Sequence, residues 1–432
     1  MSDSRLFSNI LSVFNTKIIV LLLGLVGTVL ISRGLGADGR GMLAALLIYP
    51  QLLVSVFEGG MRQSTVLFLG KKKATEAEVL GSAFTFTLVS SFIGYFFVLS
   101  LMFNFEHNNY DYILFVVSGF VLPISLAVST LKGYFLGLQK IQRFNSLAWI
   151  EKSVYAIGVV ILYFTGHVDV TSVLFLTVIS SLINLILGFW FFFAIKPKIG
   201  LFKFKTFKSM FQIGIVYGIA LFLIDVNYKV DILLINWLST FDELGRYTLS
   251  VKLGELLWQL PGAIVVVLLS KGANSSAKTM VPIVVKTIRI TLFVTSILAL
   301  GLCVFCFLFV VPIFGEGFES VPLIVTVLIP GLLFMVVFKS INSFFAGQGK
   351  PQYSIYIMVV AVVVNILLNI LLIPKLGAVG AAIASDISYL LSSVIMLMFF
   401  CKKEQVKVSD IILTKKSDFE PLINRFFNKN SC

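Results

Sequence analysis

Charged residues occur inside the long apolar stretches of this sequence, where a charge is costly unless it is paired or reaches water. Some are spaced three or four residues apart and could pair along one helix. These are Glu58 with Arg62, Asp225 with Lys229, and Lys252 with Glu255. Others have no such neighbour, namely Lys132, Asp231, Lys339 and Asp386. All of these residues are candidates for binding a charged substrate or for carrying a coupling ion.

The chemistry that these residues favour is the binding of an anion. Basic residues are expected in both halves of the membrane, and lysine and arginine donate charge-assisted hydrogen bonds to phosphate oxygens. We therefore predict a cation-lined cavity that can face either side and bind an anionic headgroup. Its predicted substrate-binding residues are Arg62, Lys229, Lys252, Lys339, Lys132 and Arg33. The predicted ion-coupling carboxylates are Asp231, Glu58, Glu255 and Asp225.

The residue patterns of common enzyme centres are missing from the sequence. It has no phosphate-binding loop, nucleophile elbow or H-E-x-x-H motif. The two histidines, His107 and His167, fall in predicted loops, and the four cysteines form no disulfide framework. We therefore predict a transporter without a metal centre or cofactor, and not an enzyme.

The elements that position these charges must be membrane-spanning helices. Of the 432 residues, 58% are hydrophobic and 13% are charged, and the mean hydropathy is +1.00, which excludes a soluble enzyme. Twelve continuous apolar runs are long enough to cross a bilayer. They cover residues 12–33, 42–69, 80–103, 112–137, 147–165, 170–195, 209–237, 246–270, 281–311, 320–346, 353–373 and 377–400. The predicted fold is an all-α polytopic membrane protein with twelve transmembrane helices.

Basic residues concentrate in every second connection between these runs. The chain carries 34 basic and 21 acidic residues, a net charge of +13. The lysines at 71–73, 196–208 and 402–403 all fall in alternate connections, which by the positive-inside rule face the cytoplasm together with both termini. The charge excess therefore indicates orientation in a membrane and not a nucleic-acid partner.

Two similar halves are expected. Gly137–Gln142 resembles Gly347–Gln352, and a basic connection lies midway along the chain. We predict a first lobe of six helices at residues 1–200 and a second at 201–402, related by an axis along the membrane normal. Residues 403–432 are predicted to form a cytoplasmic tail with an amphipathic helix on the inner leaflet. This helix is indicated by a capping box at Ser417–Glu420 and by Phe419, Leu422, Ile423, Phe426 and Phe427 on one face.

Three segments resemble the polysaccharide flippases of the multidrug/oligosaccharidyl-lipid/polysaccharide (MOP) exporter superfamily. Gly347–Pro351, Asn365–Pro374 and Gly377–Ser385 together are similar to the late-helix signature of that family. Arg33–Gly41 resembles the end of its first helix, and Asp231 with Gly245–Leu253 resembles its seventh-to-eighth-helix segment. The resemblance implies the fold of multidrug and toxin extruders (MATE), in which two six-helix lobes form a V that alternates between sides.

The resemblance also implies a function. The similar branch of O-antigen and capsule flippases moves undecaprenyl-diphosphate-linked oligosaccharides from the inner to the outer leaflet of the bacterial inner membrane. Cavity Arg and Lys residues bind the diphosphate in that family, which implies this role for Arg62, Lys229 and Lys252. We also expect a monomer surrounded by membrane lipid and in contact with the polysaccharide polymerase machinery.

Three alternatives remain open. A multidrug antiporter on the same fold would handle organic cations, and its cavity should be acidic or aromatic. A lipid II flippase should have two further helices. A membrane-embedded polymerase or ligase should have a large outward loop.

Overall fold

The fold consists of α-helices that are long enough to cross a membrane. The computed structural model describes residues 3–105, 111–259, 261–262, 277–350, 352–415 and 418. Within this part of the chain, nine helical stretches have the length and apolarity of a membrane span. Large apolar side chains face outward from them, such as Phe92, Leu300 and Phe307, which are 68%, 71% and 65% exposed. Such a surface suits lipid and not water, so the predicted multi-pass membrane protein is confirmed.

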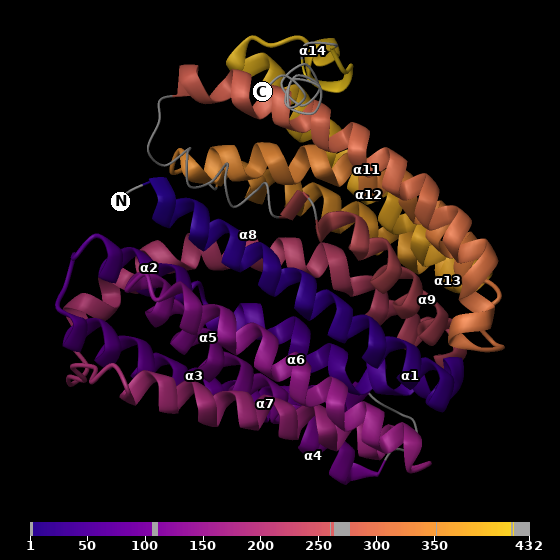
Figure 1. Cartoon of the computed structure of the whole chain (residues 1–432), viewed down its shortest axis with the longest axis horizontal. Coiled ribbons are helices and arrows are strands. Elements are labelled where there is room, and N and C mark those ends of the chain that lie inside the picture. Colours follow the sequence, from indigo (N-terminus) through magenta and orange to yellow (C-terminus); the bar gives the residue numbers. More distant parts are fainter. Residues whose placement is uncertain are drawn as a thin grey trace, which may run out of the picture.

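The first half of the chain forms one group of helices, which Figure 1 shows in indigo to magenta. They are α1 (Asp3–Glu58), α2 (Met61–Gly70), α3 (Glu76–Phe105), α4 (Tyr112–Gly119), α5 (Val121–Gly137), α6 (Ile141–Phe164) and α7 (Val170–Phe193). Apolar side chains from α1, from α3 and from α4 through α7 pack into a shared core. This core includes Tyr49, Leu122 and Val173. This group supplies one wall of the cavity described below.

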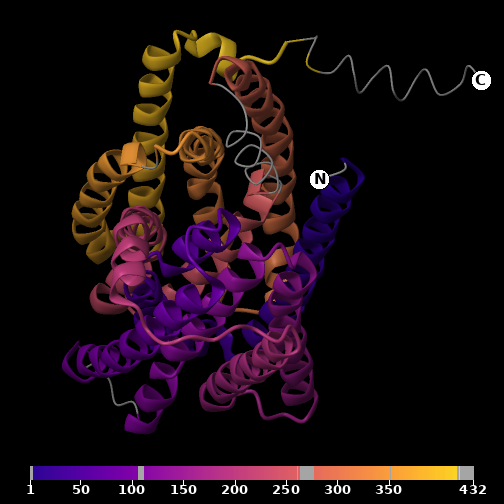
Figure 2. The ribbon, with the colours of Figure 1, turned by 90° about the vertical axis from the view of Figure 1, so that its left-hand side faces the viewer.

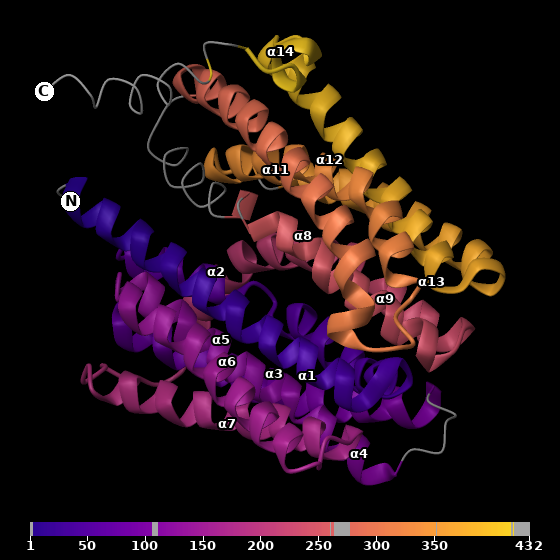
Figure 3. The same ribbon diagram turned by 45° about the vertical axis from the view of Figure 1, so that its right-hand side comes forward.

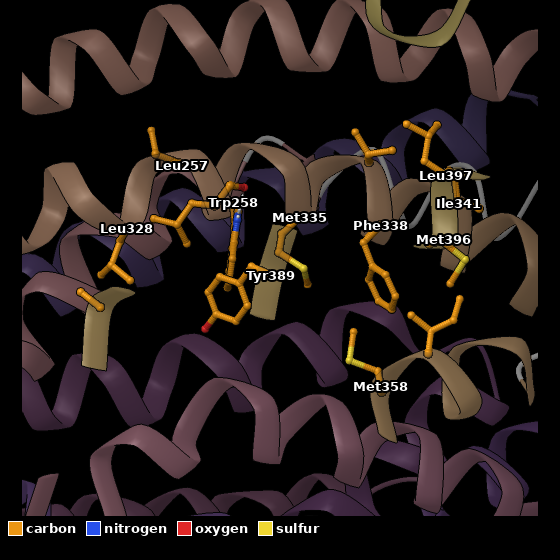
Figure 4. Packing of buried hydrophobic residues seen from close by; sticks show 14 of the residues in the cluster. Leu257, Trp258, Leu328, Met335, Phe338, Ile341, Met358, Tyr389, Met396 and Leu397 are labelled. Atoms are coloured by element: carbon orange, nitrogen blue, oxygen red, sulfur yellow. Dashed lines mark hydrogen bonds between the residues drawn. The ribbon is translucent and has the colours of Figure 1, made fainter. Parts of the chain in front are cut away.

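The second half forms a separate group around its own core. Its elements are α8 (Phe204–Leu238), α9 (Phe241–Gly254), the 3₁₀ turn η1 (Glu255–Trp258), α11 (Ala277–Phe314), α12 (Val321–Gly347), α13 (Gln352–Glu404) and α14 (Val408–Ile412). Trp258, Met335, Phe338 and Tyr389 lie together in this core, as Figure 4 shows. Figures 2 and 3 show α11, α12 and α13 on one side of the molecule and α3, α6 and α7 on the other.

Helix α8 contacts both groups. Near its start, Met210 packs in a core with α2 and α3, and its backbone carbonyl accepts a hydrogen bond from Ser64 Oγ at 2.6 Å. Near its end, Val230 and Leu234 pack in the core of the second half. The division at residues 200 and 201 therefore stays a prediction, because the helix that follows it belongs to both groups.

The boundaries of several predicted spans differ from the structure. Residues 34–41 and 374–376 were expected as connections, but they belong to α1 and α13, which bend at Gly36 (φ 67°) and Gly377 (φ 55°). Glycine adopts positive φ without a steric penalty, so each helix changes direction without a loop. Conversely, the predicted span 42–69 is interrupted at Gly59 and Gly60, which both have positive φ. The number of twelve spans stays a prediction.

The internal repeat in the sequence has a structural counterpart. At the end of α5, Lys140 N–H donates to the carbonyl of Phe135 at 2.8 Å, and at the end of α12, Lys350 N–H donates to the carbonyl of Phe345 at 2.8 Å. The residue before each lysine has positive φ. Both helices therefore end in the same left-handed cap.

The tail folds back onto α11 after α13 and α14. Arg289 of α11 donates from Nε and Nη2 to Asp418 at 2.7 and 2.6 Å, and from Nη1 to the carbonyl of Asp410 at 2.6 Å. Of the predicted capping box, only Asp418 is described, and it pairs with Arg289. The predicted amphipathic helix at 419–427 lies outside the described residues.

Candidate functional site

A cavity of about 490 Å³ lies between the two groups of helices, and we call it the inter-half cavity. Its walls come from α1, α6, α8, α9 and η1. Its charged residues are Arg40, Lys152, Lys252 and Glu255, so three bases face one acid. Neutral polar groups are supplied by Thr28, Gln51, Thr248 and Gln259, and most other lining residues are aliphatic. The arrangement can bind an anion that also carries hydroxyl groups.

Lys252 and Glu255 reach this cavity at the point where α9 changes its winding. After Gly254 the chain continues as the 3₁₀ turn η1. Glu255 lines the cavity, whereas Trp258 is buried in the core of the second half and donates from Nε1 to the carbonyl of Leu332 at 3.0 Å. The described residues contain no ion pair within 4 Å between Lys252 and Glu255, so the pairing that their spacing allows does not form. The Lys252 ammonium is left facing the cavity.

Backbones of the two halves touch beside the residues of α1 and α9 that line the inter-half cavity. A Cβ atom at Gly41 would lie 1.8 Å from the carbonyl oxygen of Phe241, and one at Gly245 would lie 1.9 Å from that of Ala37. Glycine at both positions therefore lets the second part of α1 touch the start of α9 (Figure 3). We call this pair of contacts the seal.

Two arginines reinforce the same end of the molecule. Arg33 donates from Nε to the carbonyl of Ile313 at 2.7 Å and from Nη2 to that of Pro312 at 2.5 Å. Arg246 donates from Nε to the carbonyl of Gly317 at 2.8 Å. Arg33, a predicted substrate-binding residue, thus joins α1 to the end of α11 and does not line the inter-half cavity.

A smaller cavity of about 200 Å³ lies within the first half, and we call it the N-half cavity. It brings together the predicted residues Glu58, Arg62 and Lys132 and adds Glu151. Glu58 and Arg62 form an ion pair at 3.2 Å, as their spacing allows. Two acids and two bases therefore balance each other here, in contrast to the inter-half cavity.

Helix α6 connects the two cavities. Glu151 lines the N-half cavity and its neighbour Lys152 lines the inter-half cavity. Lys152 Nζ lies 3.7 Å from Glu151 Oε1, and Asn184 Nδ2 donates to Glu151 Oε2 at 3.0 Å. Each charge is thus held by a partner on the border between the cavities.

Asp231 is fully buried in the second half and lines neither cavity. Its carboxylate accepts hydrogen bonds from Tyr247 Oη at 2.7 Å, from Asn369 Nδ2 at 2.7 Å and from Ser385 Oγ. Asn369 Oδ1 is also buried and has no donor in the part of the chain that the structure describes. The three donors are neutral, and no basic partner of Asp231 is found among the described residues. The negative charge of an ionised Asp231 would therefore be neutralised only by a proton or a small cation.

The remaining predicted residues lie elsewhere. Lys339 Nζ lies 3.2 Å from the ring centroid of Trp258, inside the second half. Asp386 accepts a hydrogen bond from a backbone N–H of α12. Asp225 and Lys229 line neither of the two cavities, and no ion pair within 4 Å joins them among the described residues.

Several residues of these sites were missed from the sequence. Arg40 was placed in a connection, because the glycines around it indicate a loop. Tyr247 and Ser385 carry no signal of their own. Asn365 and Asn369 do carry one, since two amides one turn apart within an apolar run are costly unless they bind something. Among the described residues, no group of three or more His, Cys, Asp or Glu could hold a metal ion.

A family model described as polysaccharide biosynthesis protein matches residues 6–269. An uncharacterized membrane protein of Methanocaldococcus jannaschii is 23% identical over 371 residues, which cover 82% of this chain and 88% of that protein. The structure is similar to a multidrug resistance MATE family transporter of the MOP superfamily in an inward-facing conformation, with a TM-score of 0.73 and 11% identity over 92% of this chain and 98% of that one.

The structure is also similar to the lipid II flippase MurJ in an inward closed conformation. The TM-score is 0.76 and the identity is 17%, over 99% of this chain and 93% of that one. The alignment spans nearly all of both chains, and the expectation that two further helices would set a lipid II flippase apart stays a prediction.

Proposed function

We propose that this chain, which belongs to the polysaccharide biosynthesis protein family and has the MATE-like fold of the MOP superfamily, flips undecaprenyl-diphosphate-linked oligosaccharides. Family and fold make it a membrane transporter or flippase. The repeat unit of an O-antigen or capsule, moved from the cytoplasmic to the periplasmic leaflet of a bacterial inner membrane, is the substrate that we propose. The observation that carries this proposal is the inter-half cavity, with its three bases and one acid.

The physical obstacle to such a reaction is the headgroup. An unpaired diphosphate would cost tens of kcal/mol to bring into hydrocarbon by Born estimates. A basic cavity between the halves offsets that cost, because Lys152 and Lys252 supply counter-charges in place of water. The prenyl chain stays in the lipid while the sugars contact the neutral polar groups of the cavity walls.

Alternating access follows from the seal. We place the sealed end on the periplasmic side, because the lysine-rich connections lie at the opposite end of the helices. The structure then corresponds to the state that receives substrate from the cytoplasmic leaflet. Outward movement of negative charge is favoured by an inside-negative potential, by about 2.3 kcal/mol per charge per 100 mV.

Asp231 is our candidate for coupling to an ion gradient. Its burial and its three neutral donors support binding of a proton or a sodium ion. In proteoliposomes, translocation of a short-chain prenyl-diphosphate-linked sugar by Asp231→Asn should no longer respond to an imposed gradient. The control Asp38→Asn, at an exposed position, should respond like the native chain. A normal gradient response of Asp231→Asn would exclude Asp231 as the coupling group.

The alternative is a multidrug antiporter for organic cations. Its cavity should be acidic or aromatic, whereas the ionisable residues of the inter-half cavity are mainly basic and include Arg40, Lys152 and Lys252. An organic cation would be repelled by such a lining. The charge of the cavity therefore favours the flippase over the drug transporter.

The test of the function is deletion of the gene in its own host, followed by extraction of prenyl-linked glycans and assignment of the leaflet that holds them. Single repeat units accumulating on the cytoplasmic side, with loss of surface polysaccharide, would support the proposal and identify the sugar. Accumulated lipid II would instead assign the chain to the lipid II branch. Unchanged glycan pools, in a host without a redundant flippase, would move the drug antiporter to first place.

A further inference from the structure

Three aromatic rings of the second half contact one another, and we call this group the aromatic cage. It consists of Tyr228 of α8, Trp258 of η1 and Tyr389 of α13, whose ring centroids lie 5.0, 5.7 and 6.0 Å apart. Figure 4 shows Trp258 and Tyr389 next to each other. The Trp258 indole is also held by its hydrogen bond to the carbonyl of Leu332. Rings from three elements therefore keep a fixed arrangement.

The cation in this cage is a side chain of the protein itself. Lys339 of α12 places Nζ 3.2 Å from the ring centroid of Trp258 and 5.2 Å from that of Tyr228. A cation over an aromatic ring is attracted by the negative potential of the ring face. Cages of aromatic rings bind quaternary ammonium ligands by the same attraction. Lys339 thus occupies the position that an organic cation would take.

Two carboxylates add negative charge around the cage. Asp225 lies one turn before Tyr228 on α8, and Glu255 begins η1, three residues before Trp258. Both lie close enough to Tyr228 for their charges to act on it. Carboxylates beside aromatic rings favour a cation over a neutral molecule. Without the Lys339 ammonium, the cage would keep its rings and these carboxylates but lack its cation.

The cage lies behind one wall of the inter-half cavity. Leu256 and Gln259 of the same segment line that cavity, whereas Trp258 packs in the core of the second half. Tyr228 and Lys339 are only half-buried, so the cage is not enclosed on all sides. A small cation could therefore reach the space over the rings if Lys339 left it.

We propose that Lys339 is a built-in plug of an organic-cation site, and that this residue makes the native chain refuse such cations. Removal of the plug converts the aromatic cage into a binding site for a quaternary ammonium ion. The basic lining of the inter-half cavity repels cations by charge, whereas Lys339 excludes them by occupying the cage. This inference goes beyond the proposed function, because it does not depend on which anion the inter-half cavity accepts.

The test is a calorimetric titration of the full chain in lipid nanodiscs with tetramethylammonium chloride. Lys339→Ala removes the ammonium and leaves the rings, so it should bind tetramethylammonium at least tenfold more tightly than the native chain. Lys339→Met keeps a side chain of similar length over the rings without the charge, so it should bind as weakly as the native chain. Adding Trp258→Leu to Lys339→Ala should remove the new binding. The matched control is Lys350→Ala, the same change just beyond the end of α12, which should behave like the native chain.

Each contrary result overturns a part of this inference. Binding by Lys339→Ala as weak as that of the native chain would refute the site. Equal, tight binding by Lys339→Met would show that loss of charge admits the cation, and would refute the plug. Binding that survives Trp258→Leu would place the cation outside the cage.

A second measurement covers the stability of the variant. Because a ligand stabilises the state that binds it, tetramethylammonium should raise the unfolding temperature of Lys339→Ala and leave that of the native chain unchanged. If Lys339→Ala is recovered mostly unfolded, tetramethylammonium present during extraction should increase its folded fraction. A folded fraction and an unfolding temperature that do not respond to tetramethylammonium would overturn the proposal.

Discussion

Replacing Gly41 by alanine tests whether contact between α1 and α9 seals the inter-half cavity. The new Cβ would lie 1.8 Å from the carbonyl oxygen of Phe241, whereas ordinary contact begins at 3.4 Å. The two backbones must therefore separate by about 1.6 Å, and overpacking of this kind costs about 1–3 kcal/mol. Because the cost falls on the sealed state alone, the ratio of sealed to open molecules should decrease by roughly 5- to 150-fold.

The assay measures access to the cavity from the predicted periplasmic side. Thr248 lines the cavity near the seal, so it is changed to cysteine in a chain whose native cysteines are serine, and its reaction with an impermeant maleimide is timed in cells. Gly41→Ala should speed labelling, and so should Gly245→Ala on the facing helix, whose Cβ would lie 1.9 Å from a carbonyl of α1. The control is Gly301→Ala, since a Cβ there meets nothing within 4 Å. Labelling of Gly41→Ala at the rate of this control would show that contact between α1 and α9 does not close the cavity on this side.

Three further predictions concern stability and pH. Tyr247→Phe removes a donor to the Asp231 carboxylate and should lower the unfolding free energy by about 1.5–3 kcal/mol in detergent, whereas an unchanged value would indicate that Asp231 is protonated. Trp258→Phe leaves a backbone carbonyl of α12 without its donor and should lower the unfolding free energy in detergent by about 1–3 kcal/mol. The hydrogen bond from Arg289 lowers the pKa of Asp418 below its unfolded-state value of ~3.9. This pair should therefore stabilise docking of the tail fully above pH ~3.9, and the stabilisation should be lost as the pH falls through the lower pKa of the folded state. Hydrogen exchange in α14 should therefore rise at acid pH, and Asp418→Asn should abolish that pH dependence.

The helical membrane fold was predictable because its signal is local. Apolar runs of the required length fix where helices cross the bilayer, whatever they pack against. The bends were not predictable. Glycines such as Gly36 and Gly39 are equally compatible with a loop between two helices and with one helix that changes direction. The helix continues through Gly36 because the following turn packs against α9, a contact made about two hundred residues later in the chain.

The candidate sites were predictable only in part, for the same reason. Asp231 was identified because a charge without a neighbour in an apolar run is unusual. Its donors Asn369 and Ser385 lie 138 and 154 residues away, so their approach depends on tertiary packing. Arg40 and Lys152 belong to different helices of the first half, and only the placement of α1 beside α6 brings both to one cavity.

Adjacent residues of α6 line different cavities, so a change in this helix affects both cavities. Glu151 and Lys152 follow each other in the chain, yet one lines the N-half cavity and the other lines the inter-half cavity. A rotation or shift of α6 as a rigid body therefore changes the walls of both at once. The phenotype of a substitution that displaces this helix therefore cannot be assigned to one cavity alone. It must be compared with the phenotypes of variants of Arg62, which lines only the N-half cavity, and of Thr248, which lines only the inter-half cavity.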